Sequence, residues 1–218
     1  MPASTPMMLQ YKRIKEKSGN AVLFFRLGDF YEMFEEDAKE ASRLLGLTLT
    51  QRNGVPMCGI PYHASQTYIA KLLKFGKKIA VCEQLTEPGR GKTIVERDIV
   101  EIISPGTVLQ EEFLDKTANN FLAAVGVYKK SLSFSYVDSS TGDFFSTSYP
   151  YKERVQALKT EFQRLLPREI IIQDSLLSED ADIARFIDQQ DSLLVNRFPD
   201  WSFDIKQSAE RLKRHFGM

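Results

Sequence analysis

Short apolar runs alternate with helix-forming segments through residue 103, and this alternation constrains the fold more than any other feature. The segment 21–27 includes Val22-Leu23-Phe24-Phe25, a continuous apolar run typical of a strand covered on both faces. The segment 37–45 repeats apolar residues at helical spacing and stops before Gly46, which suits a left-handed helix end. Further helices are expected at 5–17 and 65–75, and further strands at 47–50, 78–84 and 98–103. The sequence therefore predicts the α/β class, with a mixed β-sheet flanked by helices.

Local signals also indicate where elements begin and break. Thr5 followed by Pro6 suits the cap and first turn of a helix. Residues 52–64 contain four breakers, namely Gly54, Pro56, Gly59 and Pro61. That density is too high for a helix or a central strand, so we expect an ordered loop. Phe30 is expected just past the end of the strand at 21–27.

The second half of the chain predicts a second domain. Strand-like segments at 121–128, 131–138 and 143–149 are separated by short turns, which indicates an antiparallel meander. A helix at 152–166, a strand at 169–172 and helices at 178–188 and 205–216 follow. This order is that of a ribonuclease H-like fold. The polar, acidic stretch 111–117 suits a linker, so we expect domains at 1–110 and 118–218.

The charge balance limits how the chain can bind nucleic acid. It carries 29 basic and 29 acidic residues, for a formal net charge of zero. A protein that coats DNA through bulk electrostatics needs an excess of Lys and Arg at phosphates. Any nucleic-acid contact is therefore expected to be local. The best candidate is segment 71–97, where seven basic residues against three acidic ones give a net charge of +4.

Cysteine, histidine and hydropathy patterns argue against several classes of protein. Cys58 and Cys82 lack metal-ligand spacing, and His63 and His215 do not complete a site, so we expect neither a metal nor a disulfide. No apolar run reaches the roughly 18 residues that a membrane span requires, and the amino terminus lacks a signal peptide's apolar core. The chain is expected to be cytoplasmic, with no membrane partner.

An aromatic ring and a carboxylate stand two residues apart in Phe30 and Glu32. A phenyl ring stacks on any nucleobase, with a gain of roughly 1–3 kcal/mol, and a carboxylate accepts a hydrogen bond from a base edge. The pair therefore suits the reading of a base. Two structural alternatives stay open. Phe30 is core in one, and Glu32 pairs with a nearby lysine in the other.

A series of short motifs runs along the chain in a fixed order. They are Thr5-Pro6-Met7-Met8-Leu9-Gln10-Tyr11, the segments 28–34 and 56–64, Val81-Cys82-Glu83-Gln84, Glu96-Arg97, Ser104-Pro105-Gly106-Thr107, and then the segments 119–124 and 138–142. Together they resemble the amino-terminal half of the MutS family, whose members recognise DNA mismatches. The resemblance implies a mismatch-recognition domain followed by a ribonuclease H-like connector domain. More chain follows in that family, so the connector is expected to be incomplete at its carboxyl end.

The resemblance also implies roles for individual residues. Phe30 would enter the minor groove of kinked duplex and stack on a mispaired or unpaired base. Glu32 would accept a hydrogen bond from that base or, once protonated, donate one to a purine N7. Further side chains expected near DNA are Arg26, Asp29, Arg52, Met57, Tyr62, His63 and Ser65. Among these, Arg52 is expected at a phosphate and Met57 at an apolar contact.

Cofactors and partners follow from the same resemblance. The full-length family binds ATP and magnesium in a later ATPase domain, works as a homodimer and signals to MutL through its connector, so this chain is expected to hold no cofactor and no catalytic residue. Residues 89–93 read Gly-Arg-Gly-Lys-Thr, but the chain lacks the first Gly that a phosphate-binding loop needs ahead of this segment. Gln-Asp-Ser-Leu-Leu at 173–177 and 190–194 resembles sliding-clamp ligands, which need an exposed extended segment. A bacterial, nucleoid-associated location is implied.

Two other classes of function stay open. A ribonuclease H-like nuclease needs a carboxylate on its first strand for two-metal hydrolysis, and segment 121–128 has none. Only Asp138, Asp143 and Glu161 remain as ligands. The second alternative is an interaction scaffold with no DNA role, in which Phe30 is core.

Overall fold

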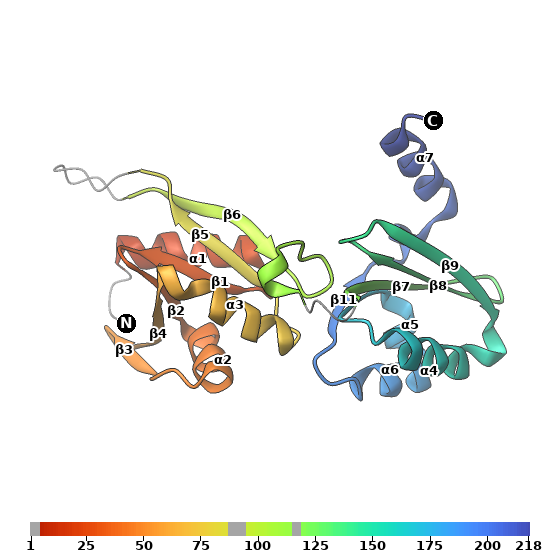
Figure 1. Cartoon of the computed structure of the whole chain (residues 1–218), viewed down its shortest axis with the longest axis horizontal. Coiled ribbons are helices and arrows are strands. Elements are labelled where there is room, and N and C mark those ends of the chain that lie inside the picture. The colour runs from red at the N-terminus through yellow and green to blue at the C-terminus, as the bar shows by residue number, and fades with distance from the viewer. Residues whose placement is uncertain (1–4, 87–94, 115–118) are drawn as a thin grey trace. The chain divides into compact units, whose positions relative to one another are not determined.

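The protein divides into two compact units (Figure 1). The structure is a computed structural model that describes residues 5–86, 95–114 and 119–218. Within these ranges the first unit extends through Pro105 and includes Gln110–Phe113, while the second holds Gly106–Leu109 and continues from Leu114. The segment Gly-Arg-Gly-Lys-Thr at 89–93 lies outside the described residues.

A mixed sheet forms the centre of the first unit. Its strands are β1 Val22–Leu27, β2 Phe30–Phe34, β3 Thr50–Arg52, β4 Val55–Pro61, β5 Ile79–Gln84 and β6 Arg97–Ile103. They pair in the order β3-β4-β2-β1-β5-β6. Only the β1–β5 pairing in this order is parallel. The α/β class with a mixed sheet is thus confirmed.

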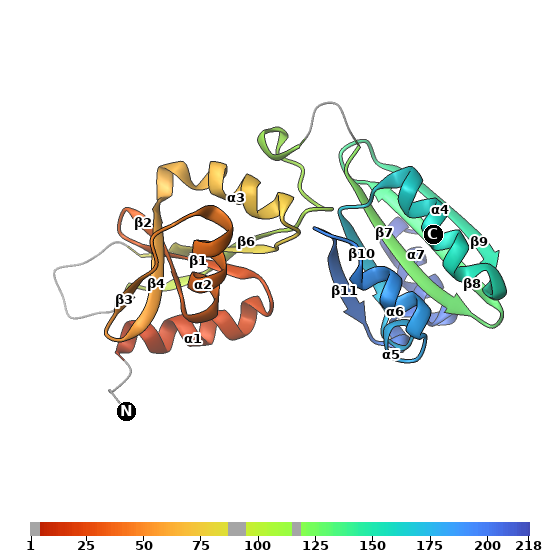
Figure 2. The same ribbon diagram turned by 90° about the horizontal axis from the view of Figure 1, so that it is seen from below.

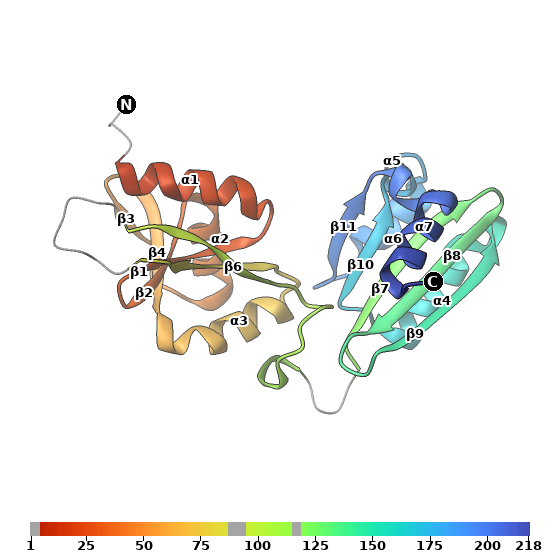
Figure 3. The ribbon, with the colours of Figure 1, turned by 90° about the horizontal axis from the view of Figure 1, so that it is seen from above.

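Helices cover both faces of this sheet. They are α1 Pro6–Ser18, α2 Glu35–Leu45 and α3 Ser65–Lys74, with a 3-10 turn η1 at Tyr62–Ala64 and another, η2, at Glu111–Phe113. The Thr5 hydroxyl accepts a hydrogen bond from the Met8 amide at 3.3 Å, which confirms the expected cap. α1 packs Tyr11 and Ile14 onto one face of the sheet. α3 lies on the opposite side of the sheet from α1 (Figure 3).

The expectation of a loop at 52–64 is wrong, because most of this segment forms strand β4. The β3–β4 connection is the Asn53-Gly54 pair, with φ of 51° and 79°. Asn-Gly with two positive φ angles is the preferred type I′ hairpin turn, whose twist matches that of the flanking strands. Pro56 lies outside the β2–β4 pairing and Pro61 ends it, so their missing N–H groups fall where few ladder bonds are lost.

The position expected for Phe30 also needs correction. Phe30 begins strand β2, which returns antiparallel to β1 with Leu27 opposite Phe30. Only Gly28 and Asp29 connect the two strands. Gly28 has a φ of 59°, as the first central residue of a type II′ turn requires. A Gly-Asp pair between two apolar runs is a hairpin signal that the interpretation as a strand end overlooked.

The second unit is also built on one mixed sheet. Its strands are β7 Phe121–Tyr128, β8 Ser131–Asp138, β9 Asp143–Pro150, β10 Glu169–Gln173 and β11 Leu194–Phe198, in the order β11-β10-β7-β8-β9. β7, β8 and β9 pair antiparallel, as expected. Parallel pairing of β10 with β7 and β11 makes the sheet mixed. β11 was not foreseen in the sequence.

Helices of the second unit lie on both sides of its sheet (Figures 2 and 3). They are α4 Arg154–Leu165, α5 Asp174–Ser178, α6 Ala181–Asp188 and α7 Ile205–Phe216, with 3-10 turns η3 Tyr151–Glu153 and η4 Asp200–Phe203. α4 and α6 bury Leu158, Phe162 and Ile183 against the sheet. The helix expected at 178–188 is α6, which begins at Ala181 because Asp180 adopts an extended conformation and caps it. The short helix α5 before it was not expected.

Candidate nucleic-acid interface

Phe30 is an exposed aromatic side chain at the tip of the β1–β2 hairpin. Its exposed fraction is 48%, whereas Phe24, Phe25 and Phe34 on the same two strands are fully buried. The alternative in which Phe30 belongs to the core is therefore wrong. An exposed ring beside a tight turn is free to meet a planar ligand, and Asp29 at the turn is exposed as well.

Glu32 lies on the same face of β2 as Phe30, and it is paired with Arg52. Side chains two residues apart on a strand point the same way. Glu32 Oε2 lies 2.5 Å from Arg52 Nη1. Glu32 was expected, in one alternative, to pair with a lysine; its partner is instead an arginine. The Glu32 side chain is 14% exposed and the Arg52 side chain is 45% exposed, so both side chains of this pair reach solvent.

The ion pair extends across strand β4. β4 lies between β2 and β3, and Gly59 stands opposite Glu32 in the register. Because Gly59 has no side chain, nothing from that position rises between the two partners. Met57, half-buried on β4, packs partly against the core beneath α1. The sheet thus brings Phe30, Glu32, Arg52 and Met57 together on one face.

Arg26 and Tyr62 do not join this group, because Arg26 alternates with Phe25 and Leu27 on β1 and so faces the other side of the sheet. The Arg26 guanidinium lies 3.7 Å from the centre of the Tyr62 ring. It also approaches Glu83, with Nη1 3.6 Å from Oε1. Any DNA contact by Arg26 would require it to leave these partners.

Tyr31 lies beneath Arg26 and is buried. Its hydroxyl donates a hydrogen bond to Glu83. Burial, followed by that hydrogen bond, raises the pKa of Tyr31 to about 12. Tyr31 is therefore a neutral, packed residue at neutral pH.

Two further residues were predicted to contact DNA. His63 lies in η1 and is exposed, and Ser65 is the first residue of α3 and is half-buried.

The basic segment 71–97 offers less free charge than expected. Arg97 is buried, and its Nε donates to the carbonyl of Arg26 at 2.7 Å. Burial lowers the pKa of Arg97. Lys77 pairs with Glu40 at 2.6 Å. Arg90 and Lys92 lie outside the described residues.

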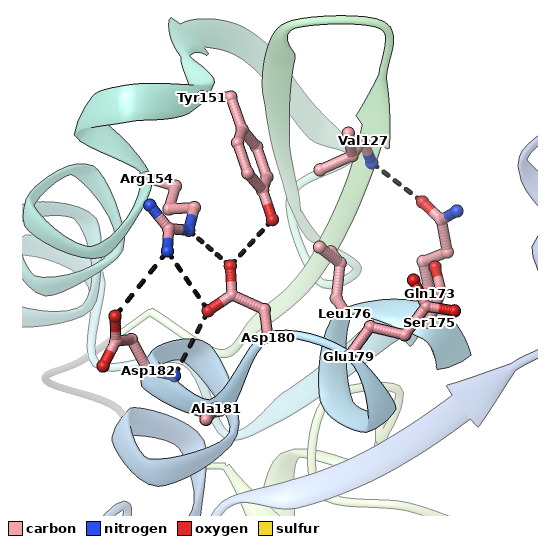
Figure 4. Close-up of a pocket in the computed structure, with 10 residues that line it drawn as sticks. All are labelled: Val127, Tyr151, Arg154, Gln173, Ser175, Leu176, Glu179, Asp180, Ala181 and Asp182. Carbon is pink, nitrogen blue, oxygen red and sulfur yellow. Dashed lines mark hydrogen bonds and ion pairs between the residues drawn. The ribbon is translucent and has the colours of Figure 1, made fainter.

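The second unit contains an open cavity of about 510 Å³ (Figure 4). Its lining includes Tyr151, Arg154, Leu176, Asp180 and Asp182. Asp180 accepts hydrogen bonds from Arg154, from the Tyr151 hydroxyl at 2.7 Å and from the Ile183 amide at 3.2 Å. These partners occupy both carboxylate oxygens. The network therefore serves to cap α6 and tie it to α4.

The three carboxylates left open for a nuclease are separately engaged. Asp138 accepts from Asn119 at 3.0 Å and from Ser140, Asp143 accepts from Thr141 at 2.8 Å, and Glu161 pairs with Arg164 at 2.5 Å. Within 5–86, 95–114 and 119–218, no group of three or more His, Cys, Asp or Glu residues is arranged to hold a metal ion. The geometry gives the nuclease alternative no support.

Neither Gln-Asp-Ser-Leu-Leu segment is an exposed extended peptide. Leu176 of the first lies in α5, and Leu194 of the second begins β11. Both leucines are buried. The condition for clamp binding is therefore not met at either place.

In the described part of the chain, no helix combines the length and apolar character needed to cross a membrane.

Comparison with known proteins gives one consistent result. A family model described as MutS domain I matches residues 5–112, and MutS domain II matches residues 120–218. Similar proteins include DNA mismatch repair protein MutS of Treponema denticola, 48% identical over 98% of this chain and 25% of the relative. The proteins of the same name from Treponema pallidum strain Nichols and Borreliella burgdorferi strain B31 are 44% and 43% identical, over 99% and 98% of this chain and 24% of each relative. The chain thus spans about a quarter of these relatives' length.

Proposed function

The chain belongs to the MutS family, and from that membership we propose that it recognises mismatched double-stranded DNA in DNA mismatch repair. Support comes from the family models that cover both units. The observation that carries the proposal is the exposed Phe30 on a hairpin tip with Glu32 beside it on the same face. The exposed ring can stack on a nucleobase, and the carboxylate beside it can accept a hydrogen bond from the edge of that base.

In this proposal Phe30 acts as an apolar wedge. Inserted from the minor groove, its ring stacks on one base of the mismatch, opens the base step and kinks the duplex. Unstacking costs a few kcal/mol, and least for a mismatched base whose pairing is already weak. Discrimination then comes from the ease of deformation, so a single site serves many mismatches. Met57, on the same face, would lie against the groove as an apolar contact.

Glu32 and Arg52 would act together beside the wedge. An isolated carboxylate near phosphates is repelled, but Arg52 lies 2.5 Å from Glu32 and offsets its charge. On DNA, Arg52 would move to a phosphate, and Glu32 would accept a hydrogen bond from the wedged base or donate one to a purine N7 when protonated. On fully paired duplex Glu32 would find no partner, which disfavours normal DNA.

For the chain itself we propose a binding role without catalysis or a bound cofactor. ATP and magnesium, homodimer formation and the interaction of the connector with MutL belong to the full-length protein in this proposal. A bacterial cytoplasmic, nucleoid-associated location follows from the same role. A sliding-clamp contact is disfavoured, because Leu176 and Leu194 are buried.

The test compares Phe30→Ala with wild type in the full-length protein that carries this chain. Affinities are measured at matched salt for a G·T-mismatched and a fully paired duplex, together with the melting temperature. We expect Phe30→Ala to abolish the preference for the mismatch without lowering the melting temperature, because the ring is half-exposed.

Phe144→Ala is the matched control, since this ring is 67% exposed on β9 of the second unit. It should leave both affinities unchanged. Retained mismatch preference in Phe30→Ala, or an equal loss in Phe144→Ala, would refute the wedge.

A further inference from the structure

We propose that Arg26, Tyr62 and Gln84 form a support that fixes the turn carrying Phe30, and that they act on DNA only through that ring. We call these three residues the turn support. The inference rests on the proposed function, and it assigns Arg26 and Tyr62 a positioning role in place of direct DNA contact.

The turn is held by side chains from both of its flanks. The Gly28 amide donates to Gln84 Oε1 at 2.9 Å, which ties the turn to the end of β5. The Gly28 carbonyl accepts from Arg26 Nε at 2.5 Å. Both backbone hydrogen-bonding groups of Gly28 are therefore occupied, and Gly28 cannot rotate without losing one of them.

The second turn residue is held through the β4–α3 junction. The Tyr62 amide donates to the Asp29 carbonyl at 3.0 Å. The Tyr62 ring lies against the Arg26 guanidinium at 3.7 Å, an attraction between a cation and an aromatic face. Arg26 thus contacts both the Gly28 carbonyl and Tyr62, the residue that holds Asp29. Its own backbone is held by Arg97 Nε, which donates to the Arg26 carbonyl at 2.7 Å.

Burial and charge argue that Arg26 supports the turn and does not bind phosphate. Its side chain is only 16% exposed, compared with 45% for Arg52. Its charge is met by Glu83, 3.6 Å away. Arg26 also faces the side of the sheet opposite Phe30 and Glu32. A phosphate on the Phe30 side is therefore within reach of Arg52 and not of Arg26.

Such a support has a thermodynamic purpose. A ring that must enter a base step at one angle loses conformational freedom on binding, and fixing it beforehand removes that cost. A two-residue turn opened by glycine is otherwise adaptable, because glycine accepts many backbone conformations. These hydrogen bonds fix the backbone that precedes Phe30 and leave its ring exposed.

The experiment uses Arg26→Met and Gln84→Met in the full-length protein. Gln84→Met keeps the length of the side chain, Arg26→Met keeps an apolar chain that reaches about as far as Nε, and both remove the polar group. We expect binding to a G·T mismatch to weaken about three- to tenfold, the range set by one or two lost hydrogen bonds. Affinity for paired duplex should change less than twofold, and Arg43→Met, an exposed arginine on α2, should change neither.

Two further readouts separate a support from a DNA contact. In a Phe30→Ala background, Arg26→Met should have no additional effect, because the support acts through the ring. The slope of log affinity against log salt should stay unchanged, whereas loss of a phosphate contact lowers it by about 0.9.

The turn support is overturned if Arg26→Met and Gln84→Met leave mismatch affinity unchanged, or if the loss persists with Phe30→Ala and the salt slope falls. It is also overturned if both affinities fall together with the melting temperature in both variants, which would indicate a purely structural role. The proposed function fails separately, when Phe30→Ala itself retains mismatch preference.

Discussion

Phe30 and Phe34 share a strand and a face, yet one is half-exposed and the other fully buried. Phe34 packs against Tyr11 of α1, with ring centres 5.0 Å apart, and its carbonyl accepts from the Tyr11 hydroxyl at 3.2 Å. Phe30 stands at the other end of β2, beside the turn. Helix cover, rather than residue type or strand alternation, therefore decides which aromatic ring is available to a ligand.

At the residue scale, Glu32→Gln should raise the affinity for fully paired duplex about three- to tenfold and so narrow mismatch preference. The substitution keeps the shape of the side chain but removes a negative charge that DNA repels. Binding at two salt concentrations measures it, and the gain should shrink at high salt because the charge is screened. Glu36→Gln is the control, because the Glu36 side chain is exposed on α2. An equal gain in affinity for paired duplex in that variant would contradict a specific role for Glu32.

At the scale of elements, two tight turns bring the candidate site together. Asn53-Gly54 follows Arg52 and sets the β3–β4 register, and Gly28-Asp29 precedes Phe30 and sets the β1–β2 register. A shift of one residue in either hairpin would move its side chains to the opposite face. The meeting of Glu32 and Arg52 therefore depends on turn geometry as much as on the two charges.

The prediction at this scale concerns Asp180, which caps α6. Burial opposes its ionised form, but hydrogen bonds from Arg154, Tyr151 and the Ile183 amide outweigh burial and lower its pKa to about 2. A pKa below the unfolded value of about 3.9 stabilises the fold above that pH. The contribution is lost as the pH falls from about 4 through 2.

Asp180→Asn should therefore destabilise the second unit by roughly 1–3 kcal/mol at pH 7. The difference in the free energy of unfolding between this variant and wild type should narrow below pH 4. Urea unfolding at pH 7 and pH 3 measures both quantities. Asp188→Asn, at the exposed end of the same helix, is the control and should be neutral. A difference independent of pH would contradict the role of the carboxylate charge.

At the scale of the whole molecule, each unit has its own hydrophobic core. In the first unit Tyr11, Phe25 and Phe34 belong to one buried cluster, and in the second Phe134 and Phe162 belong to another. Segments that bury separate cores tend to unfold as separate cooperative units. Stability changes should therefore be confined to the unit that carries the substitution.

Phe34→Ala should lower the stability of the first unit by roughly 3–5 kcal/mol, the cost of removing a buried phenyl ring. The unfolding of the second unit should be unchanged. Calorimetry of the 218-residue chain resolves this, with Phe134→Ala as the reciprocal control. If either variant shifts both transitions equally, the units do not unfold independently.

The sequence determined features whose causes are local. Periodicity predicted the α/β class and the antiparallel meander, and the cap at Thr5 and the left-handed end at Gly46 were each recognisable from a few neighbouring residues. The aromatic and carboxylate pair at Phe30 and Glu32 was also visible in the chain itself. The Asn53-Gly54 and Gly28-Asp29 turns are equally local, although Pro56 and Pro61 favoured a loop at the first and the apolar run at 21–27 favoured a strand end at the second.

Only the tertiary structure decided which distant side chains meet. Arg52 reaches Glu32 because β4 lies between their strands, and Arg97 is buried although the charge pattern suggested a basic surface. Arg26 faces away from Phe30 and turns to Tyr62. Strand order and helix cover fix these outcomes, and both depend on pairing between residues far apart in the chain, for which no local pattern carries the information.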